Sequence, residues 1–247
     1  MKTNLNRVIC RLDIKNEFVI KGINFEGLRK IGNPNELAKK YNDYNVDEFF
    51  IYDVVASLYG RNQLFNIVKN ISKNIFIPIC ISGGIRNLKD IEYALKSGAD
   101  KVAFNSVLFN NFSILKNSCK NFGVSNIVIN IETKKIGKNY WEVYINGGRD
   151  KTGIELINWI KKITDYHFGE IIISSIDHDG TMKGFDYELI DYILSKIKIN
   201  FPLIIGGGCK NLNDIKNFKK KYSLISCFVG SALHYNKIKK KDLQKLK

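Results

Sequence analysis

The stretch ISGGIRNLKDI, Ile81 to Ile91, recurs later in the chain as IGGGCKNLNDI, Ile205 to Ile215. Seven of the eleven positions are identical, and the copies lie 124 residues apart in a chain of 247. Each copy contains a Gly-Gly turn followed by residues typical of a helix start. The repeat therefore predicts two related halves, each with the same glycine turn at the same place.

Short β-branched runs alternate with longer segments of helical periodicity along the whole chain. Eight such strand-helix units in about 240 residues is the number found in a (β/α)8 TIM barrel. A doubly wound open sheet is the alternative, but it usually has fewer strands and one dominant glycine turn after the first strand. The runs occupy residues 7–13, 48–53, 77–82, 101–105, 126–132, 170–175, 202–207 and 225–230.

Half-length offsets extend the repeat beyond the glycine turns. Each of the four strands in the first half has a counterpart, in order, in the second half, and an open sheet gives no reason for this. We expect one (β/α)8 barrel domain over residues 1–247, fused from half-barrels at about 1–122 and 123–247. The aligned pairs are Glu48 with Glu170, Asp13 with Glu132, and Ser106 with Ser231.

The repeated turns also predict a ligand. Gly-Gly pairs at 83–84 and 207–208 end strands, and the next strands end in the small polar pairs 105–106 and 230–231. Glycine permits close backbone approach, and N–H groups at a following helix start attract anions. For one such turn, a purely structural strand-to-helix connection is the simpler interpretation. Two symmetric sites at the carboxyl ends of barrel strands instead predict an elongated ligand with a phosphate at each end.

The first strand of each half ends in a carboxylate, Asp13 or Glu132. As symmetry mates they should face one another across the mouth of the barrel, which suits general acid and general base catalysis. Solvated or capping carboxylates are the alternative. A further acidic segment, SIDHDGTMKGFD, contains Asp179 and Gly180, which suit a loop that contacts hydroxyl or phosphate groups. His178 has no Cys or His at ligand spacing, so we expect a surface loop residue and no metal site.

Composition excludes several classes of protein. The formal charge is +15, but only six of the 39 basic residues are arginine, and the lysines concentrate on predicted helix faces and in the tail at 237–247. No recognition helix or aromatic-basic platform accompanies them, so we do not expect nucleic-acid binding. The N-terminus lacks an apolar signal core and no window approaches ~18 apolar residues, so we expect no membrane contact. Five scattered cysteines suit reduced thiols in the cytoplasm.

Several segments together resemble the cyclase subunit of imidazole glycerol phosphate synthase. They are RVICRLDIKNEFVIKGINFEGLRKIGNP, ISGGIRN, GADKVAFNS, EIIISSIDHDGTMKGFD and GSALHY, and they run through almost the whole chain. The resemblance implies a barrel that receives ammonia from a glutaminase docked at its N-terminal face and needs no cofactor. The implied substrate is phosphoribulosyl-formimino aminoimidazole carboxamide ribonucleotide, which is phosphorylated at both ends. The implied products are imidazole glycerol phosphate and aminoimidazole carboxamide ribonucleotide.

The resemblance also implies roles for individual residues. The acid-base pair falls on Asp13 and Glu132, and Lys21 falls in a mobile loop that closes over substrate. A sister isomerase shares the phosphate sites and carboxylates, but it lacks this loop and the charged ring thought to gate ammonia. The implied phosphate contacts are Gly84, Asn105 and Ser106 at one end and Asp179, Gly180, Gly208, Gly230 and Ser231 at the other. The implied ring is Arg7, Glu48, Lys101 and Glu170.

Two departures from the family pattern concern the chemistry. Glu132 stands where aspartate is usual, and Arg11 stands where the family has a small residue. Period-two alternation directs Arg11 into the barrel, where a buried guanidinium needs an acidic partner. We expect Arg11 to pair with Glu132 or Glu48, to lower the pKa of Glu132 if that is the partner, and to narrow the route from the ring to the mouth. The altered carboxylate leaves an alternative function open, a paralogue that supplies ammonia for amidation of a surface-polysaccharide sugar.

Overall fold

The computed structural model describes residues 6–56, 63–244 and 246. Its centre is a closed barrel of eight parallel strands, in which β1 pairs with β12 and β4, and β10 pairs with both β7 and β11. The predicted (β/α)8 barrel is confirmed, and the open sheet is excluded because no edge remains among these eight strands. They are β1 (Val8–Lys15), β4 (Glu48–Asp53), β5 (Ile79–Ser82), β6 (Lys101–Phe104), β7 (Ile127–Gly137), β10 (Glu170–Ser175), β11 (Leu203–Gly206) and β12 (Ile225–Val229).

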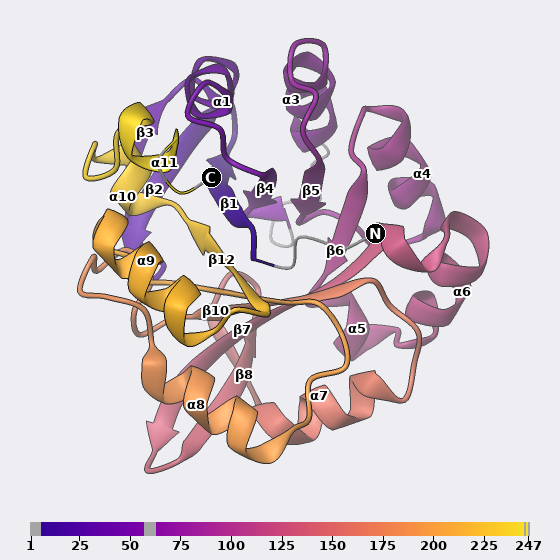
Figure 1. The fold of residues 1–247 in the computed structure, drawn as a ribbon. Helices are drawn as coiled ribbons and strands as arrows, with labels where there is room; N and C mark the ends of the chain where they lie inside the picture. Colours follow the sequence, from indigo (N-terminus) through magenta and orange to yellow (C-terminus); the bar gives the residue numbers. More distant parts are fainter. Residues whose placement is uncertain (1–5, 57–62, 245, 247) are drawn as a thin grey trace.

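Helices surround the strands (Figure 1). Each of the longer helices turns an apolar face towards the barrel; α7 (Leu156–Thr164), for example, buries Leu156, Trp159, Ile160 and Ile163. The others are α1 (Pro34–Asn42), α3 (Gln63–Ser72), α4 (Leu88–Lys96), α5 (Val107–Asn110), α6 (Ser113–Phe122), α8 (Tyr187–Lys196), α9 (Leu212–Lys221), α10 (Ser231–His234) and α11 (Lys240–Gln244), with a 3-10 turn at Val124–Asn126. Within the described ranges, no helix is long and apolar enough to span a membrane.

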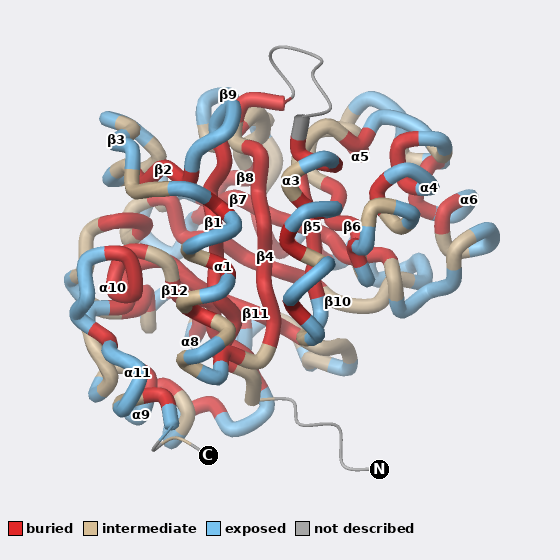
Figure 2. Tube along the Cα trace, turned by 90° about the horizontal axis from the view of Figure 1, so that it is seen from above, coloured by how far each residue is buried: buried red, intermediate tan, exposed pale blue. Residues whose placement is uncertain are grey.

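The interior of the barrel is a packed core of its own. It receives at least one buried side chain from every barrel strand, and Figure 2 shows these strands buried along most of their length. Because side chains alternate along a strand, the residues between them face the helices and form the larger outer core. The inner residues are Ile9, Phe50, Tyr52, Cys80, Ala103, Val128, Ile172, Ile204 and Phe228.

Two hairpins extend the sheet at the carboxyl ends of the strands, where β2, β3, β8 and β9 lie at the top of Figure 2. β2 (Phe18–Ile23) and β3 (Glu26–Gly32) follow β1, whereas β8 (Tyr140–Ile145) and β9 (Asp150–Glu155) follow β7. Asn16, Asn24 and Asn146 allow the tight turns because they adopt left-handed backbone conformations. The segment after the first strand, which the resemblance implies to be a mobile loop, forms the strands β2 and β3 in the structure.

Candidate active site

The first glycine turn follows β5 at the mouth of the barrel. Gly83 and Gly84 have φ values of +95° and +75°, and a Cβ atom on Gly83 would overlap the carbonyl oxygen of Asp53. Glycine is therefore required here both for backbone conformation and for space.

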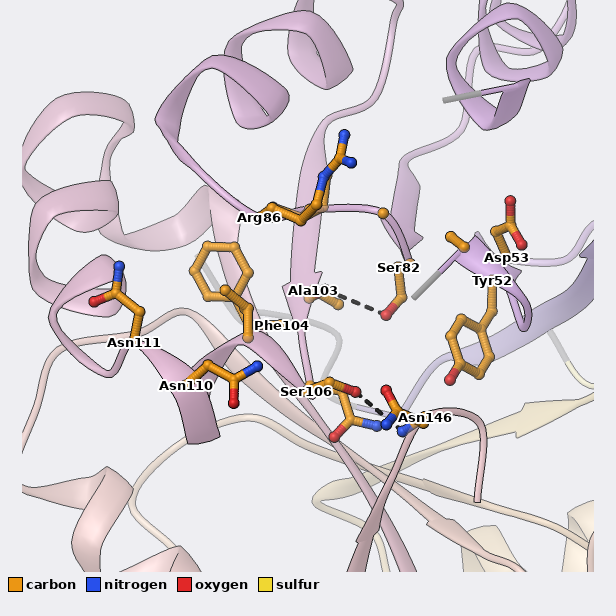
Figure 3. Close-up of a pocket in the computed structure, with 16 residues that line it drawn as sticks. Tyr52, Asp53, Ser82, Arg86, Ala103, Phe104, Ser106, Asn110, Asn111 and Asn146 are labelled. Atoms are coloured by element: carbon orange, nitrogen blue, oxygen red, sulfur yellow. Dashed lines mark hydrogen bonds between the residues drawn. The ribbon is translucent and has the colours of Figure 1, made fainter. Parts of the chain in front are cut away.

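This turn borders a cavity of about 360 Å³ (Figure 3). The predicted phosphate contacts Gly84, Asn105 and Ser106 all line it. Ser106 precedes α5, and its Oγ accepts a hydrogen bond of 3.0 Å from the backbone N–H of Asn146 in the β8–β9 turn. The structure thus brings the three predicted residues of one phosphate site together.

The second glycine turn follows β11, four strands away around the barrel. Gly207 and Gly208 also have positive φ values, +110° and +87°, and a Cβ atom on Gly208 would overlap the Gly184 carbonyl oxygen. The Oγ of Ser231 is buried and has no hydrogen-bond partner within the part of the chain that the structure describes. Asp179, Gly180, Gly208, Gly230 and Ser231, the predicted contacts of the second phosphate, line one small hollow.

Lys21 connects the β2–β3 hairpin to both sides of the mouth. Its Nζ lies 2.7 Å from Asp13 Oδ2 and 2.8 Å from Asp179 Oδ2, and all three side chains are buried. Asn24 fixes the hairpin further, because its backbone N–H donates to the Asp179 carbonyl oxygen over 2.8 Å. The hairpin is therefore closed over this side of the mouth.

Arg11 points into the barrel, as period-two alternation predicted. The prediction that it pairs with Glu132 or Glu48 is wrong. Its Nε donates to Asp13 Oδ1 over 2.6 Å, and its Nη1 donates across the barrel to Ser174 Oγ over 3.0 Å. The guanidinium reaches the carboxylate two residues along its own strand, and neither Glu132 nor Glu48 is its ion-pair partner in the described residues.

The two candidate catalytic carboxyl groups have opposite pKa shifts. Burial alone would raise the pKa of Asp13, but the charges of Arg11 and Lys21 outweigh it and lower the pKa to about 2. For Glu132 burial dominates and raises the pKa, although Tyr52 and Arg11 partly oppose it. The lowered Glu132 pKa was expected only for an Arg11–Glu132 ion pair, and that pair does not form because the guanidinium is bound to Asp13.

Glu132 contacts Asn105, which lines the first cavity. Its Oε2 accepts hydrogen bonds from Asn105 Nδ2 at 3.0 Å and from the backbone N–H of Gly148 at 2.8 Å. Its Oε1 is buried, and the Tyr52 hydroxyl is a further hydrogen-bond donor to this carboxyl group. Such a carboxyl group can hold a proton and donate it to a ligand beside it.

Four charged side chains form a ring at the opposite, N-terminal end of the barrel. Arg7 Nη1 and Nη2 lie 2.5 Å from Glu48 Oε2 and 2.8 Å from Glu170 Oε1. Lys101 Nζ lies 3.0 Å from Glu48 and 3.1 Å from Glu170. Each charge contacts two opposite charges, so the ring neutralises itself at the base of the barrel.

Comparison with known proteins fits this geometry. The family described as "Histidine biosynthesis protein" matches residues 7–239. The chain belongs to this family. The subunit HisF of imidazole glycerol phosphate synthase from Legionella pneumophila is 44% identical over 208 residues, which are 84% of this chain and 97% of the relative.

Other relatives give the same result. HisF of Bacillus cereus strain AH187 is 38% identical over 229 residues, 93% of this chain and 90% of the relative. HisF of Helicobacter hepaticus is 39% identical over 238 residues, which are 96% of this chain and 93% of the relative. The chain is accordingly an enzyme of the HisF type, the cyclase subunit of imidazole glycerol phosphate synthase in histidine biosynthesis, and the surface-sugar alternative is not favoured.

Sequence reasoning missed several residues of the site. Asn146 and Gly148 come from the β8–β9 hairpin, and Ser174 anchors Arg11. The hairpin had a readable signal, because alternating residues 140–145 lead into Asn-Gly-Gly, a common hairpin turn. His178 is half-buried, with Nδ1 at 2.9 Å from the Gly184 carbonyl oxygen. Across the described residues, no group of three or more His, Cys, Asp or Glu side chains is arranged to hold a metal ion.

Proposed function

We propose that the chain uses ammonia from a glutaminase to close an imidazole ring on a substrate that carries a phosphate at each end. The substrate is phosphoribulosyl-formimino aminoimidazole carboxamide ribonucleotide, and the products are imidazole glycerol phosphate and aminoimidazole carboxamide ribonucleotide. One observation carries this proposal. Two glycine-lined sites lie on opposite sides of the barrel mouth, together with two buried carboxyl groups of opposite pKa shift.

The two ends of the substrate bind to the two glycine sites. Gly84, Asn105 and Ser106 hold one phosphate in the 360 Å³ cavity. The second phosphate binds beside the unpartnered Oγ of Ser231, where the start of α10 offers backbone N–H groups. Lys21 supplies a positive charge next to this site and neutralises Asp179. The remaining contacts of the second phosphate are Gly180, Gly208 and Gly230.

The acid and base roles follow from the two environments. Adding ammonia to a carbonyl group and expelling water and an amine requires a proton donor and a proton acceptor. Glu132 serves as the donor, because burial raises its pKa and so favours the protonated form. Asp13 serves as the anionic partner, since Arg11 and Lys21 keep it ionised.

The glutaminase docks at the N-terminal face, beside the ring of Arg7, Glu48, Lys101 and Glu170, which gates ammonia entry. Three large apolar side chains in the loops that lead into strands at this face support the docking. Phe76 is 91% exposed, Leu224 71% and Val124 42%. Exposed apolar residues gathered at one end of a protein are typical of an interaction surface.

We also propose that residues 1–247 form one domain, fused from half-barrels at about 1–122 and 123–247. Matching local structure after the two glycine turns supports it. The backbone N–H of Arg86 donates to Asp90 Oδ2 over 2.9 Å, and that of Lys210 donates to Asp214 Oδ2 over 2.8 Å. Asn87 and Asn211 cap the two helices that follow.

The test is a cyclase assay of the purified chain with the bis-phosphorylated substrate and an ammonium salt at alkaline pH. We expect turnover in the wild type and its loss in Asp13→Asn. Substrate that binds through its phosphates without being converted would contradict the proposal and support the surface-sugar paralogue instead.

A further inference from the structure

Arg11 occupies the middle of the barrel just below the mouth. It is 1% exposed, and its guanidinium carbon lies 5.1 Å from the ring centroid of Phe25 and 5.2 Å from those of Tyr52 and Phe228. The ring of Phe50 is 5.8 Å away. Cations are attracted to aromatic faces, so these four rings hold the charge in place as well as enclose it.

The anchors of Arg11 lie on two strands of the barrel that are not neighbours. Asp13 is on β1 and Ser174 is on β10, and the hydrogen bonds of 2.6 and 3.0 Å stretch the side chain between them. In the barrel order these strands are separated by β11 and β12 on one side and by four strands on the other. The guanidinium therefore crosses the interior rather than lying along its wall.

Below Arg11, buried side chains line the interior towards the charged ring. Arg11 of β1 is in register with Phe50 of β4. Phe50 is in register with Cys80 of β5, and Cys80 with Lys101 of β6, which belongs to the ring. Phe50 and Cys80 are both fully buried. Cys80 thus marks the interior immediately on the mouth side of the ring.

We propose that the Arg11 side chain closes the interior of the barrel between the charged ring and the mouth. Ammonia passes from the ring to the substrate only after the guanidinium leaves Asp13 and Ser174. Because Asp13 is also the proposed catalytic carboxylate, opening of the route is tied to the state of the active site. The role in ammonia passage rests on the proposed function, whereas the closure itself does not.

The closure is tested by the reactivity of Cys80 towards methyl methanethiosulfonate, a small thiol reagent. The background variant is Cys119→Ser, which removes the partly exposed thiol; Cys10, Cys209 and Cys227 are buried. Modification at Cys80 is followed by mass spectrometry of its peptide. We expect Arg11→Ala to raise its rate by about tenfold or more, since the rate for a buried group reports how often the structure opens.

A matched variant separates closure from loss of charge. Arg11→Met removes the ion pair with Asp13 but keeps an unbranched side chain that fills the space. If the Arg11 side chain closes the interior by filling it, Cys80 is modified slowly in Arg11→Met and fast in Arg11→Ala. Equal rates in the two variants, or fast modification in the unaltered chain, would overturn the proposal. Arg11→Val replaces Arg11→Ala if the latter does not show a cooperative thermal unfolding transition.

The role in ammonia passage is tested in the complex with the glutaminase. Any damage to the chemistry affects turnover from glutamine and from ammonium equally, so their ratio isolates passage through the barrel. We expect this ratio to rise by about threefold or more in Arg11→Ala, because gating steps limit many turnover rates. An unchanged ratio would overturn the gating role. Absence of turnover from either source in the unaltered chain would instead refute the proposed function and leave the thiol result standing.

Discussion

Arg11 Nε donates to Asp13 Oδ1 over 2.6 Å, so the guanidinium inside the barrel neutralises the carboxylate two residues further along its own strand. The second oxygen of Asp13 is bound by Lys21 at 2.7 Å. Glu132 is left with neutral hydrogen-bond donors, Asn105 and the backbone of Gly148. One intrastrand contact thus helps to give the two carboxyl groups opposite pKa shifts, lowered for Asp13 and raised for Glu132.

Asp13→Asn should change how stability depends on pH. The pKa of Asp13 is lowered from 3.8 to about 2 in the folded protein, so its contribution is present above pH 3.8 and is lost as the pH falls towards 2. We expect the variant to be less stable by about 2 kcal/mol at neutral pH, with the difference vanishing near pH 2. Urea unfolding at several pH values measures this. A difference that stays constant with pH would contradict the assignment.

Glu132→Gln should remove the proton donor while keeping the hydrogen bonds from Asn105 and Gly148. Turnover should fall by about 10²- to 10⁴-fold, with substrate affinity little changed. Because the pKa of Glu132 is raised, its favourable contribution is complete below the unfolded pKa and is lost as the pH rises through the folded value. The amide has no such dependence. If the unfolding free energies of variant and wild type run parallel through that range, Glu132 is not a proton-holding group.

Glu48→Gln should destabilise the protein through the charged ring. Glu48 is 1% exposed and contacts both Arg7 and Lys101, so its neutralisation leaves their charges less compensated. We expect a loss of about 3 kcal/mol in urea unfolding. The control is Glu92→Gln in the exposed pair with Lys96, where we expect no measurable loss, because solvent screens exposed ion pairs. Equal losses in the two variants would refute a cooperative ring.

Gly208→Ala should impair the second phosphate site. The added Cβ overlaps the Gly184 carbonyl oxygen at a position with φ +87°. Gly153, with φ +73° and nothing within 4 Å of an added Cβ, is the matched control for backbone strain alone. We expect both substitutions to cost about 1–2 kcal/mol in strain, but only Gly208→Ala to weaken substrate binding in calorimetry. Similar affinities for the two variants would remove this turn from the site.

Phe76→Asp tests the docking face. A charge on a 91% exposed apolar residue of this face should weaken association with the glutaminase by about tenfold or more, while ammonium-dependent turnover is unchanged. Ile136→Asp is the control, because Ile136 is 50% exposed on β7 where the strand continues into the hairpin at the other end of the barrel. Equal binding of both variants in surface plasmon resonance would place the glutaminase elsewhere.

The sequence alone determined the architecture and the location of the candidate site. Short β-branched runs located all eight barrel strands to within two residues at their starts, and Glu170–Ser175 was placed without error. The repeat at Ile81 and Ile205 then identified the two glycine turns, whose positive φ values only glycine adopts easily. Local pattern was sufficient, because alternation and turn chemistry are set by neighbours in the chain.

Only the tertiary structure decided which charges meet. Alternation predicted that Arg11 points inwards. That it binds Asp13 rather than Glu132 depends on how far the guanidinium reaches inside the barrel, where it also binds Ser174. The pKa values followed from that choice, because burial raises the pKa of both carboxyl groups and only the bound cations lower that of Asp13. Distances between strands far apart in the chain are not written in any local pattern, and the electrostatics of the site depends on those distances.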